Sequence, residues 1–305
     1  MKYELIYNEA GGMHQIRALV DIPSIDIKAG DMGGYVKSEH NLSQDGNCWI
    51  FNQARVCDQA RVCEQAIVCD DAIVSGEAIV SGEAIVSGEA MVYGQARVRD
   101  KAIVSEHAVV CDQARVSEHA IVSGQAVVCD QARVSEQATV CDHARVSYHA
   151  RVSGQAIVCG YARVSEHAIV SEHAVVCNQA MVYGQATVCD HARVSGQATV
   201  SGQAIVSEHA VVCDQARVSY HAVVSGHGHI TQASDYFVAG PIGSRDGMTT
   251  IYRTDNGLDV VCGCFSGTVD EFLAAVLEKH GNNRHAQDYR ALIALAKSRI
   301  LGGKG

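Results

Sequence analysis

A six-residue repeat occupies more than half of the chain. From Ala54 to His227 the pattern Ala-x-Val-(Ser/Cys)-x-x recurs 29 times without insertion or deletion, and it covers 174 of the 305 residues. The period is a multiple of the two-residue strand period and does not fit the 3.6-residue helical period. Ala and Val therefore point to the same side of a short strand, and the polar pair that ends each repeat forms a corner.

The apolar content of the chain is mostly Ala and Val. Hydrophobic residues make up 48% of the sequence, yet aromatic residues make up only 5%. With 19% charged residues, the chain does not have the composition of a disordered protein. We expect a narrow interior that admits only small and branched side chains, with the few large residues left for the two ends.

The repeat resembles the hexapeptide repeat of left-handed β-helix proteins, the transferase hexapeptide superfamily. The resemblance implies an all-β fold, a left-handed parallel β-helix in which three hexads form one triangular coil, so that 29 hexads give about ten coils. It also implies that the branched aliphatic residue and the small residue two positions before it point inward. The chain ends are similar to those of uncharacterised bacterial and phage members, some of which are labelled acyltransferases on their fold alone.

Three segments follow from where the period breaks. Residues 1–51 form an N-terminal cap and a first irregular coil, residues 52–231 form the β-helix, and residues 232–305 form a small α+β C-terminal cap. Caps are needed because a stack of coils exposes two open strand edges. The irregular coil keeps the repeat spacing at Val36, Leu42 and Ile50. The C-terminal cap is expected to hold three strands and two helices, at 236–239, 249–253, 258–262, 268–280 and 284–300.

Outward strand positions 18 residues apart stack into columns. One column, the aliphatic face, is apolar over successive coils, with Ile67, Ile85, Ile103, Ile121, Thr139, Ile157 and Val175. An exposed apolar stripe of this length usually marks an interface, although β-propensity alone also places branched residues on strands. We expect self-association through this face, as a dimer or a trimer.

A second column, the arginine ladder, carries like charges on four successive coils, at Arg97, Arg115, Arg133 and Arg151. Two interpretations are open. In the first, Asp100, Glu118 and Glu136, three residues downstream, compensate the charge in exposed ion pairs that contribute little stability. In the second, the ladder contacts an anionic ligand or an acidic partner surface, because guanidinium groups suit carboxylate and phosphate.

Histidines concentrate in the corner slot before Ala. One corner column offers candidate ligands for a borderline metal such as zinc, at His173, Asp190, His191 and His209. A second cluster forms a candidate patch for a small ligand, at Tyr148, His149, His167 and Tyr183. Because Gln or Glu fills the same slot elsewhere, a solvated polar corner is the competing explanation of both clusters.

Thirteen cysteines do not indicate a disulfide framework. Their number is odd, the chain is long and its first residues do not read as a signal peptide, so we expect reduced thiols in a cytoplasmic protein. Most of them alternate with Ser, which indicates selection for a small side chain. The net charge of −10 argues against nucleic acid as a partner, and the lack of an 18-residue apolar run argues against a membrane.

The uninterrupted repeat favours binding over catalysis. Members of the resembled family with known activity generally extrude a loop that helps to build a cleft between subunits, whereas no loop interrupts these hexads. We expect a non-catalytic binding or scaffold protein of phage or prophage type, oligomeric and without a cofactor, that engages a host protein or a small anionic ligand through its faces or caps. The alternative is an acyltransferase with an inter-subunit active site. Polar candidates for chemistry at the C-terminal end are His227, His229, Arg245 and Asp246.

Overall fold

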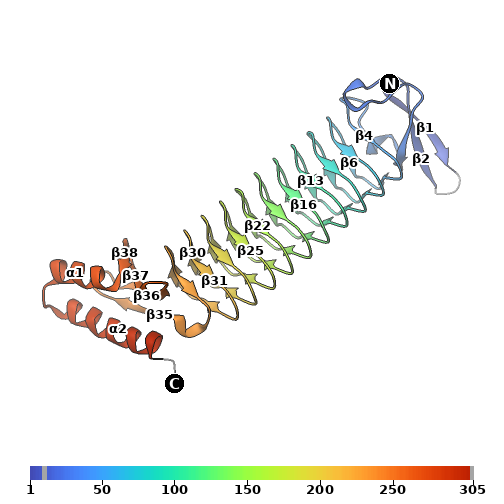
Figure 1. Ribbon diagram of the computed structural model, residues 1–305. Helices are drawn as coiled ribbons and strands as arrows, with labels where there is room; N and C mark the ends of the chain where they lie inside the picture. Colours follow the sequence, from blue (N-terminus) through green and yellow to red (C-terminus); the bar gives the residue numbers. More distant parts are fainter. Residues whose placement is uncertain (9–11, 303–305) are drawn as a thin grey trace. The chain divides into compact units, whose positions relative to one another are not determined.

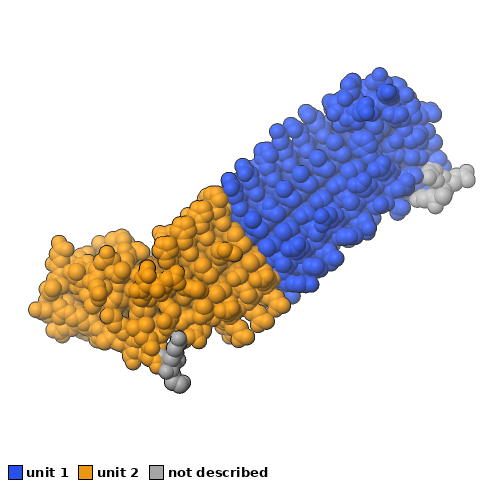
Figure 2. Space-filling view, in the orientation of Figure 1, with its two compact units in different colours: residues 1–166 blue, residues 167–305 orange. Residues whose placement is uncertain are grey.

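The computed structural model describes residues 1–8 and 12–302 (Figure 1). The chain divides into two compact units, residues 1–166 and residues 167–305 (Figure 2). The division falls inside the hexad repeat, and both units contain coils of the same design. The fold is a β-helix of stacked parallel strands with a small α+β region at its C-terminal end, as the repeat predicts.

Each hexad forms a strand of two residues. These strands begin at every sixth residue, from β5 (Arg55–Val56) to β33 (Val223–Val224). Within unit 1, strands three hexads apart pair in parallel and in register, so that β10 (Ile85–Val86) lies beside β13 (Ile103–Val104). Three successive strands therefore make one coil, and residues 18 apart in sequence are neighbours on one face.

Ala and Val fill the interior of the coils. Every repeat Ala and Val from Ala54 to Val224 has an exposed fraction of 0%. The residue between them points outward, because successive side chains of a strand lie on opposite faces. Full burial of each Val contributes on the order of 1.5–3 kcal/mol to the free energy of folding. Every repeat adds one such contribution.

The corners require a left-handed backbone. The residue after the Ser or Cys slot has φ near +60°, as at Asp130 (60°) and Gly124 (68°). Asp at this position also serves the next coil, because the Asp130 carboxylate accepts a hydrogen bond from the backbone N–H of Tyr148 at 3.1 Å. The same arrangement recurs at other corners: the carboxylates of Asp58, Asp70 and Asp142 each accept a hydrogen bond at 3.0 Å from the backbone N–H of the glycine 18 residues further along.

The N-terminal end of unit 1 forms the irregular first coil. Strands β1 (Tyr3–Asn8), β2 (Met13–Ala18) and β3 (Met32–Val36) are antiparallel neighbours, and the short helices η1 (Pro23–Ile25) and η2 (Glu39–Asn41) lie in the connections. Then β3 pairs in parallel with β5, Leu42 bridges to Val62, and β4 (Trp49–Ile50) pairs with β7 (Ile67–Val68). Val36, Leu42 and Ile50 are at most 1% exposed, which confirms their predicted inward positions.

The end of unit 2 is an antiparallel sheet covered by two helices. After β34 (His229–Ile230) and η3 (Ala233–Asp235), the sheet is formed by β35 (Tyr236–Ile242), β36 (Gly247–Thr254), β37 (Gly257–Cys262) and β38 (Phe265–Thr268). The helices are α1 (Val269–His280) and α2 (Arg284–Leu301). The predicted strands and helices of this segment are confirmed, and β38 is an additional strand.

Strand β36 covers the open strand edge of unit 2. The Thr250 hydroxyl accepts a hydrogen bond from the backbone N–H of Val223 at 3.0 Å, and the Tyr252 hydroxyl lies 3.2 Å from the Ser225 hydroxyl. This cap therefore satisfies polar groups that the last coil would otherwise expose.

Candidate functional site

The arginine ladder forms one continuous row in unit 1. The strand register places Arg97 beside Arg115, Arg115 beside Arg133 and Arg133 beside Arg151. All four side chains point outward and are exposed. Stacked strands are about 4.8 Å apart, so these like charges repel one another unless an anion lies among them.

A groove of about 110 Å³ runs beside three of these arginines. Its lining, which we call the arginine groove, consists of Gln113, Arg115, Gln131, Arg133, His149 and Arg151. The side chains come from two adjacent columns, the outward strand position and the corner slot two residues before it. Three guanidinium groups, two amides and an imidazole line this groove without a carboxylate, so its chemistry suits an anion.

The ion pairs that the sequence suggested for the ladder do not form, so that interpretation is wrong. Within residues 1–8 and 12–302, no carboxylate lies at ion-pair distance from any of the four ladder guanidinium groups. Asp100 instead lies 3.6 Å from Arg99 Nε and accepts a hydrogen bond from the backbone N–H of Glu118 at 3.3 Å. The left-handed corner is the physical reason, since it places the acid beside the backbone of the next coil.

The predicted histidine column stacks ring on ring. The imidazole centroids of His173 and His191 are 4.6 Å apart with ring planes within 21°, and those of His191 and His209 are 5.2 Å apart. The Asp190 carboxylate accepts hydrogen bonds from the Glu208 backbone N–H and the Cys189 thiol, both at 3.3 Å. The structure therefore does not bring His173, Asp190, His191 and His209 together as the ligands of one ion.

The second predicted cluster is divided between the two units. Tyr148 and His149 belong to unit 1, and His167 and Tyr183 belong to unit 2. His149 lines the arginine groove, whereas Tyr148 is 58% exposed. Tyr183 lines a different hollow of about 500 Å³, within unit 2, together with Met181, Arg217 and Tyr220 among others.

Two cysteine groups bring candidate metal ligands within 4.8 Å of one another in the part of the chain that the structure describes. They are Cys111, Asp112 and Cys129, and Cys141, Asp142 and Cys159. The 18-residue spacing of Cys141, Cys159 and Cys177 predicts one stacked column, and the exchange of Cys with Ser favours a small space-filling side chain over thiol chemistry. Arg145 Nη2 lies 3.6 Å from Cys129 Sγ, so a positive charge already occupies the surroundings of the first group.

The aliphatic face is stacked in register in unit 1. Consecutive strands pair the outward residues Ile67, Ile85, Ile103, Ile121, Thr139 and Ile157. Val175 holds the equivalent outward position in unit 2. Ile121 and Ile157 are 37% and 40% exposed, so the middle and end of this row in unit 1 present apolar surface.

The chain was compared with protein families, curated proteins and solved structures. A scan of protein-family models finds no match, and neither does a search of curated proteins. Among solved structures, LpxA from Acinetobacter baumannii is similar, with a TM-score of 0.33 and 11% sequence identity, over 79% of this chain and 92% of LpxA. The architecture is identified by its two-residue strands, which recur every six residues and pair with strands 18 residues apart. The chain folds as a hexapeptide-repeat β-helix. Neither α-helix of this β-helix protein, within its described residues, has the length and hydrophobicity to cross a membrane.

Proposed function

We propose that this hexapeptide-repeat β-helix is a binding protein whose arginine groove holds an anionic ligand. The observation that carries this proposal is that three stacked arginines line a groove without a carboxylate partner. Two of their strands, β15 (Arg115–Val116) and β18 (Arg133–Val134), are fixed by parallel backbone pairing on both sides. Little backbone freedom is then lost when a ligand binds, which favours affinity.

The spacing of the groove favours a ligand with more than one anionic group. Each guanidinium offers a fork of N–H donors that fits one carboxylate or phosphate, and neighbouring forks are about one strand spacing apart, about 4.8 Å. The side-chain amides of Gln113 and Gln131 provide further donors along the same line. We therefore propose a small polycarboxylate or polyphosphate as the ligand class.

Removal of the three groove charges tests the proposal. We expect the variant with Arg115→Gln, Arg133→Gln and Arg151→Gln to bind tripolyphosphate and citrate at least about 30-fold more weakly than the wild type, because charge-assisted hydrogen bonds are lost. Isothermal titration calorimetry at low ionic strength measures the change, and added salt should weaken wild-type binding through screening.

A matched control carries the same change of net charge outside the groove. Arg61, Arg163 and Arg193 are also exposed outward strand residues, and none lines the groove. Their combined replacement by Gln should leave the affinity for both probes close to that of the wild type. Equal weakening in the two triple variants would mean that the anions respond only to net charge, and the groove would not be the site.

The aliphatic face is the part of the proposal that concerns self-association. We expect Ile103→Glu with Ile121→Glu to convert an oligomer into a monomer, because charged side chains would have to be buried without partners at the centre of the face. Light scattering coupled to size-exclusion chromatography measures the mass. The control Met91→Glu with Val109→Glu changes two outward residues of another face and should leave the mass unchanged. An unaltered mass for the Ile103 and Ile121 variant contradicts the role of this face.

Acyl transfer is the second candidate function, because the resembled family includes acyltransferases and the fold is of the hexapeptide type. Residues 54–227, all of which the structure describes, run from strand to strand without an extruded loop. Release of free thiol from acetyl-coenzyme A in the presence of amine or hydroxyl acceptors tests this candidate. Turnover that survives purification to homogeneity would replace the binding proposal by the enzymatic one.

The biological setting remains part of this proposal. We further propose a phage or prophage origin, because the chain ends resemble bacterial and phage hexapeptide-repeat proteins, with a host protein or a small anionic ligand as the partner. We also propose a reducing, cytoplasmic location, because the number of cysteines is odd and most of them alternate with Ser. Capture from host lysate, compared between wild type and the groove variant, would identify the ligand.

A further inference from the structure

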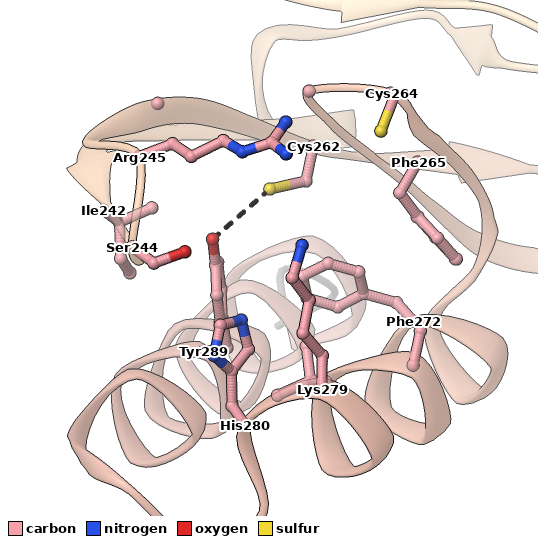
Figure 3. A pocket seen from close by; sticks show the side chains of 14 residues that line it. Ile242, Ser244, Arg245, Cys262, Cys264, Phe265, Phe272, Lys279, His280 and Tyr289 are labelled. Atoms are coloured by element: carbon pink, nitrogen blue, oxygen red, sulfur yellow. Dashed lines mark hydrogen bonds between the residues drawn. The ribbon is translucent and has the colours of Figure 1, made fainter.

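The C-terminal cap contains a cavity that is separate from the arginine groove and lies wholly within unit 2. It has a volume of about 150 Å³ and lies between the β35–β36 turn, the β37–β38 turn and the two helices (Figure 3). An apolar cavity of about this size accommodates a ring the size of benzene. The cavity therefore has room for one small ring and not for a nucleotide or a coenzyme.

The interior wall of the cavity is aromatic. Phe272 packs against Phe265 and Tyr289 with ring centroids 5.2 Å apart in both pairs, tilted in the first and edge-to-face in the second. Val276 and Ile242 complete the apolar lining. Aromatic rings pack favourably edge-to-face or offset, so this wall prefers a flat aromatic group.

Tyr289 is held firmly at the base of the cavity. Its hydroxyl lies 3.5 Å from Cys262 Sγ, and the same sulfur accepts a hydrogen bond from the Thr249 hydroxyl at 3.2 Å. Gly243 lies so close that a Cβ there would come within 1.9 Å of the Tyr289 hydroxyl oxygen. Burial and the neighbouring Cys262 raise the pKa of Tyr289 to about 12, so its hydroxyl stays neutral.

The mouth of the cavity is cationic. Arg245, from the β35–β36 turn, and Lys279, near the end of α1, extend toward the same space in Figure 3, with His280 beside them. Neither Arg245 nor Lys279 has an ion-pair or hydrogen-bond partner within the described residues. The fourteen lining residues include no Asp or Glu. An apolar body with one negative charge at its outer end matches this distribution.

From this geometry we propose that the cap cavity binds a small aromatic carboxylate, with the ring against Phe265, Phe272 and Tyr289 and the carboxylate between Arg245 and Lys279. The carboxylate accepts hydrogen bonds from the guanidinium and the ammonium, and the ring replaces water in the apolar interior. This site makes no use of the arginine groove, so each proposal stands without the other.

Benzoate is the probe for this proposal, measured by calorimetry and by saturation-transfer NMR on the full chain. We expect benzoate to bind the wild type, and its neutral counterpart benzyl alcohol to bind at least about tenfold more weakly. The double variant Arg245→Ala with Lys279→Ala should lower benzoate affinity by at least about tenfold. The control Arg290→Ala with Lys297→Ala removes two exposed charges of α2 outside the cavity and should leave affinity unchanged.

A second pair of variants tests the apolar interior. Ala275→Trp fills the cavity from α1 and should abolish benzoate binding, whereas Ala274→Trp, at an exposed position beside it, should not. If Ala275→Trp alters the circular dichroism spectrum, it no longer reports on binding, and the proposal is tested by the double variant Arg245→Ala with Lys279→Ala and its control. Absence of benzoate binding at ~10 mM, or equal affinity in the wild type and the Arg245 and Lys279 variant, overturns the proposal. The arginine-groove variant should bind benzoate like the wild type.

Discussion

Val110→Asp is expected to lower the free energy of unfolding of unit 1 by more than about 4 kcal/mol, whereas Val109→Asp is expected to change it by less than about 1 kcal/mol. The two valines are consecutive residues of β14 (Val109–Val110). Val110 is fully buried in the row of interior valines, and the outward Val109 is half-buried. A carboxylate at position 110 would lie among Ala and Val side chains, none of which can donate a hydrogen bond to it.

Both variants introduce the same side chain, so they differ only in whether it points into the β-helix or away from it. Each coil contacts only its neighbours, so a disrupted interior coil separates the coils on its two sides and lowers cooperativity. Urea unfolding followed by circular dichroism should show an earlier and broader transition for Val110→Asp. A similar midpoint for the two variants would contradict the assigned alternation of inward and outward residues.

Asp235→Ala is expected to destabilise the C-terminal cap by about 3–5 kcal/mol, because it leaves a partly buried arginine without its partner. The Asp235 side chain is 2% exposed and lies 3.0 Å from Arg253 Nε. It also accepts hydrogen bonds from the Thr231 backbone N–H at 2.9 Å and the Thr231 hydroxyl at 2.8 Å. Arg253 in turn donates to the carbonyl oxygen of Ile300, in the last turn of α2, so one acid connects three elements of the cap.

The same carboxyl predicts a pH dependence of cap stability. Burial by itself raises the pKa of Asp235, but the hydrogen bonds from Thr231, Arg253 and Gln232 outweigh it and hold the pKa below its ordinary value. A depressed pKa in the folded state means that the stabilisation is complete above the unfolded pKa, near 3.9, and is lost as pH falls through the folded value. Asp235→Asn should therefore flatten the loss of cap stability below about pH 4.

An exposed acid of the same cap provides the control for Asp235. The Asp255 side chain is 74% exposed and lies 3.3 Å from His229 Nδ1. Asp255→Ala should lower the free energy of unfolding by less than about 1 kcal/mol, because exposed ion pairs contribute little to stability. Thermal unfolding measured by calorimetry distinguishes the two variants. Equal shifts for Asp235→Ala and Asp255→Ala would contradict the structural role assigned to the buried pair.

The strict period made the β-helix and its columns predictable. Because no insertion interrupts the hexads, a single offset of 18 residues placed Arg115 beside Arg133 and Ile85 beside Ile103 without any knowledge of side-chain contacts. The same periodicity identified the arginine ladder, three of whose members, Arg115, Arg133 and Arg151, line the groove. The groove itself and its lining residues Gln113 and Gln131 were not predicted, because Gln recurs in the corner slot throughout the repeat. In a regular repeat, the sequence spacing alone therefore identifies which outward side chains are neighbours.

Side-chain directions at the corners were not predictable in the same way. Whether Asp100 pairs with the ladder or with a backbone N–H depends on the left-handed corner, which Gly, Asp, Glu and Tyr all occupy in this chain. The cap cavity was also missed, although Arg245 was named as a polar candidate. Its walls combine Ile242, Cys262 and Tyr289 from segments that no period relates, and only tertiary packing brings them together.

The most direct measurement of the central claim is anomalous diffraction from crystals of the protein grown with selenate, a heavy-atom counterpart of phosphate and sulfate. We predict an anomalous peak in the arginine groove, within hydrogen-bonding reach of the guanidinium groups of Arg115, Arg133 or Arg151, and its loss in the triple Gln variant. Selenate peaks elsewhere on the surface with none in the groove would contradict the assignment of this β-helix face as an anion-binding site.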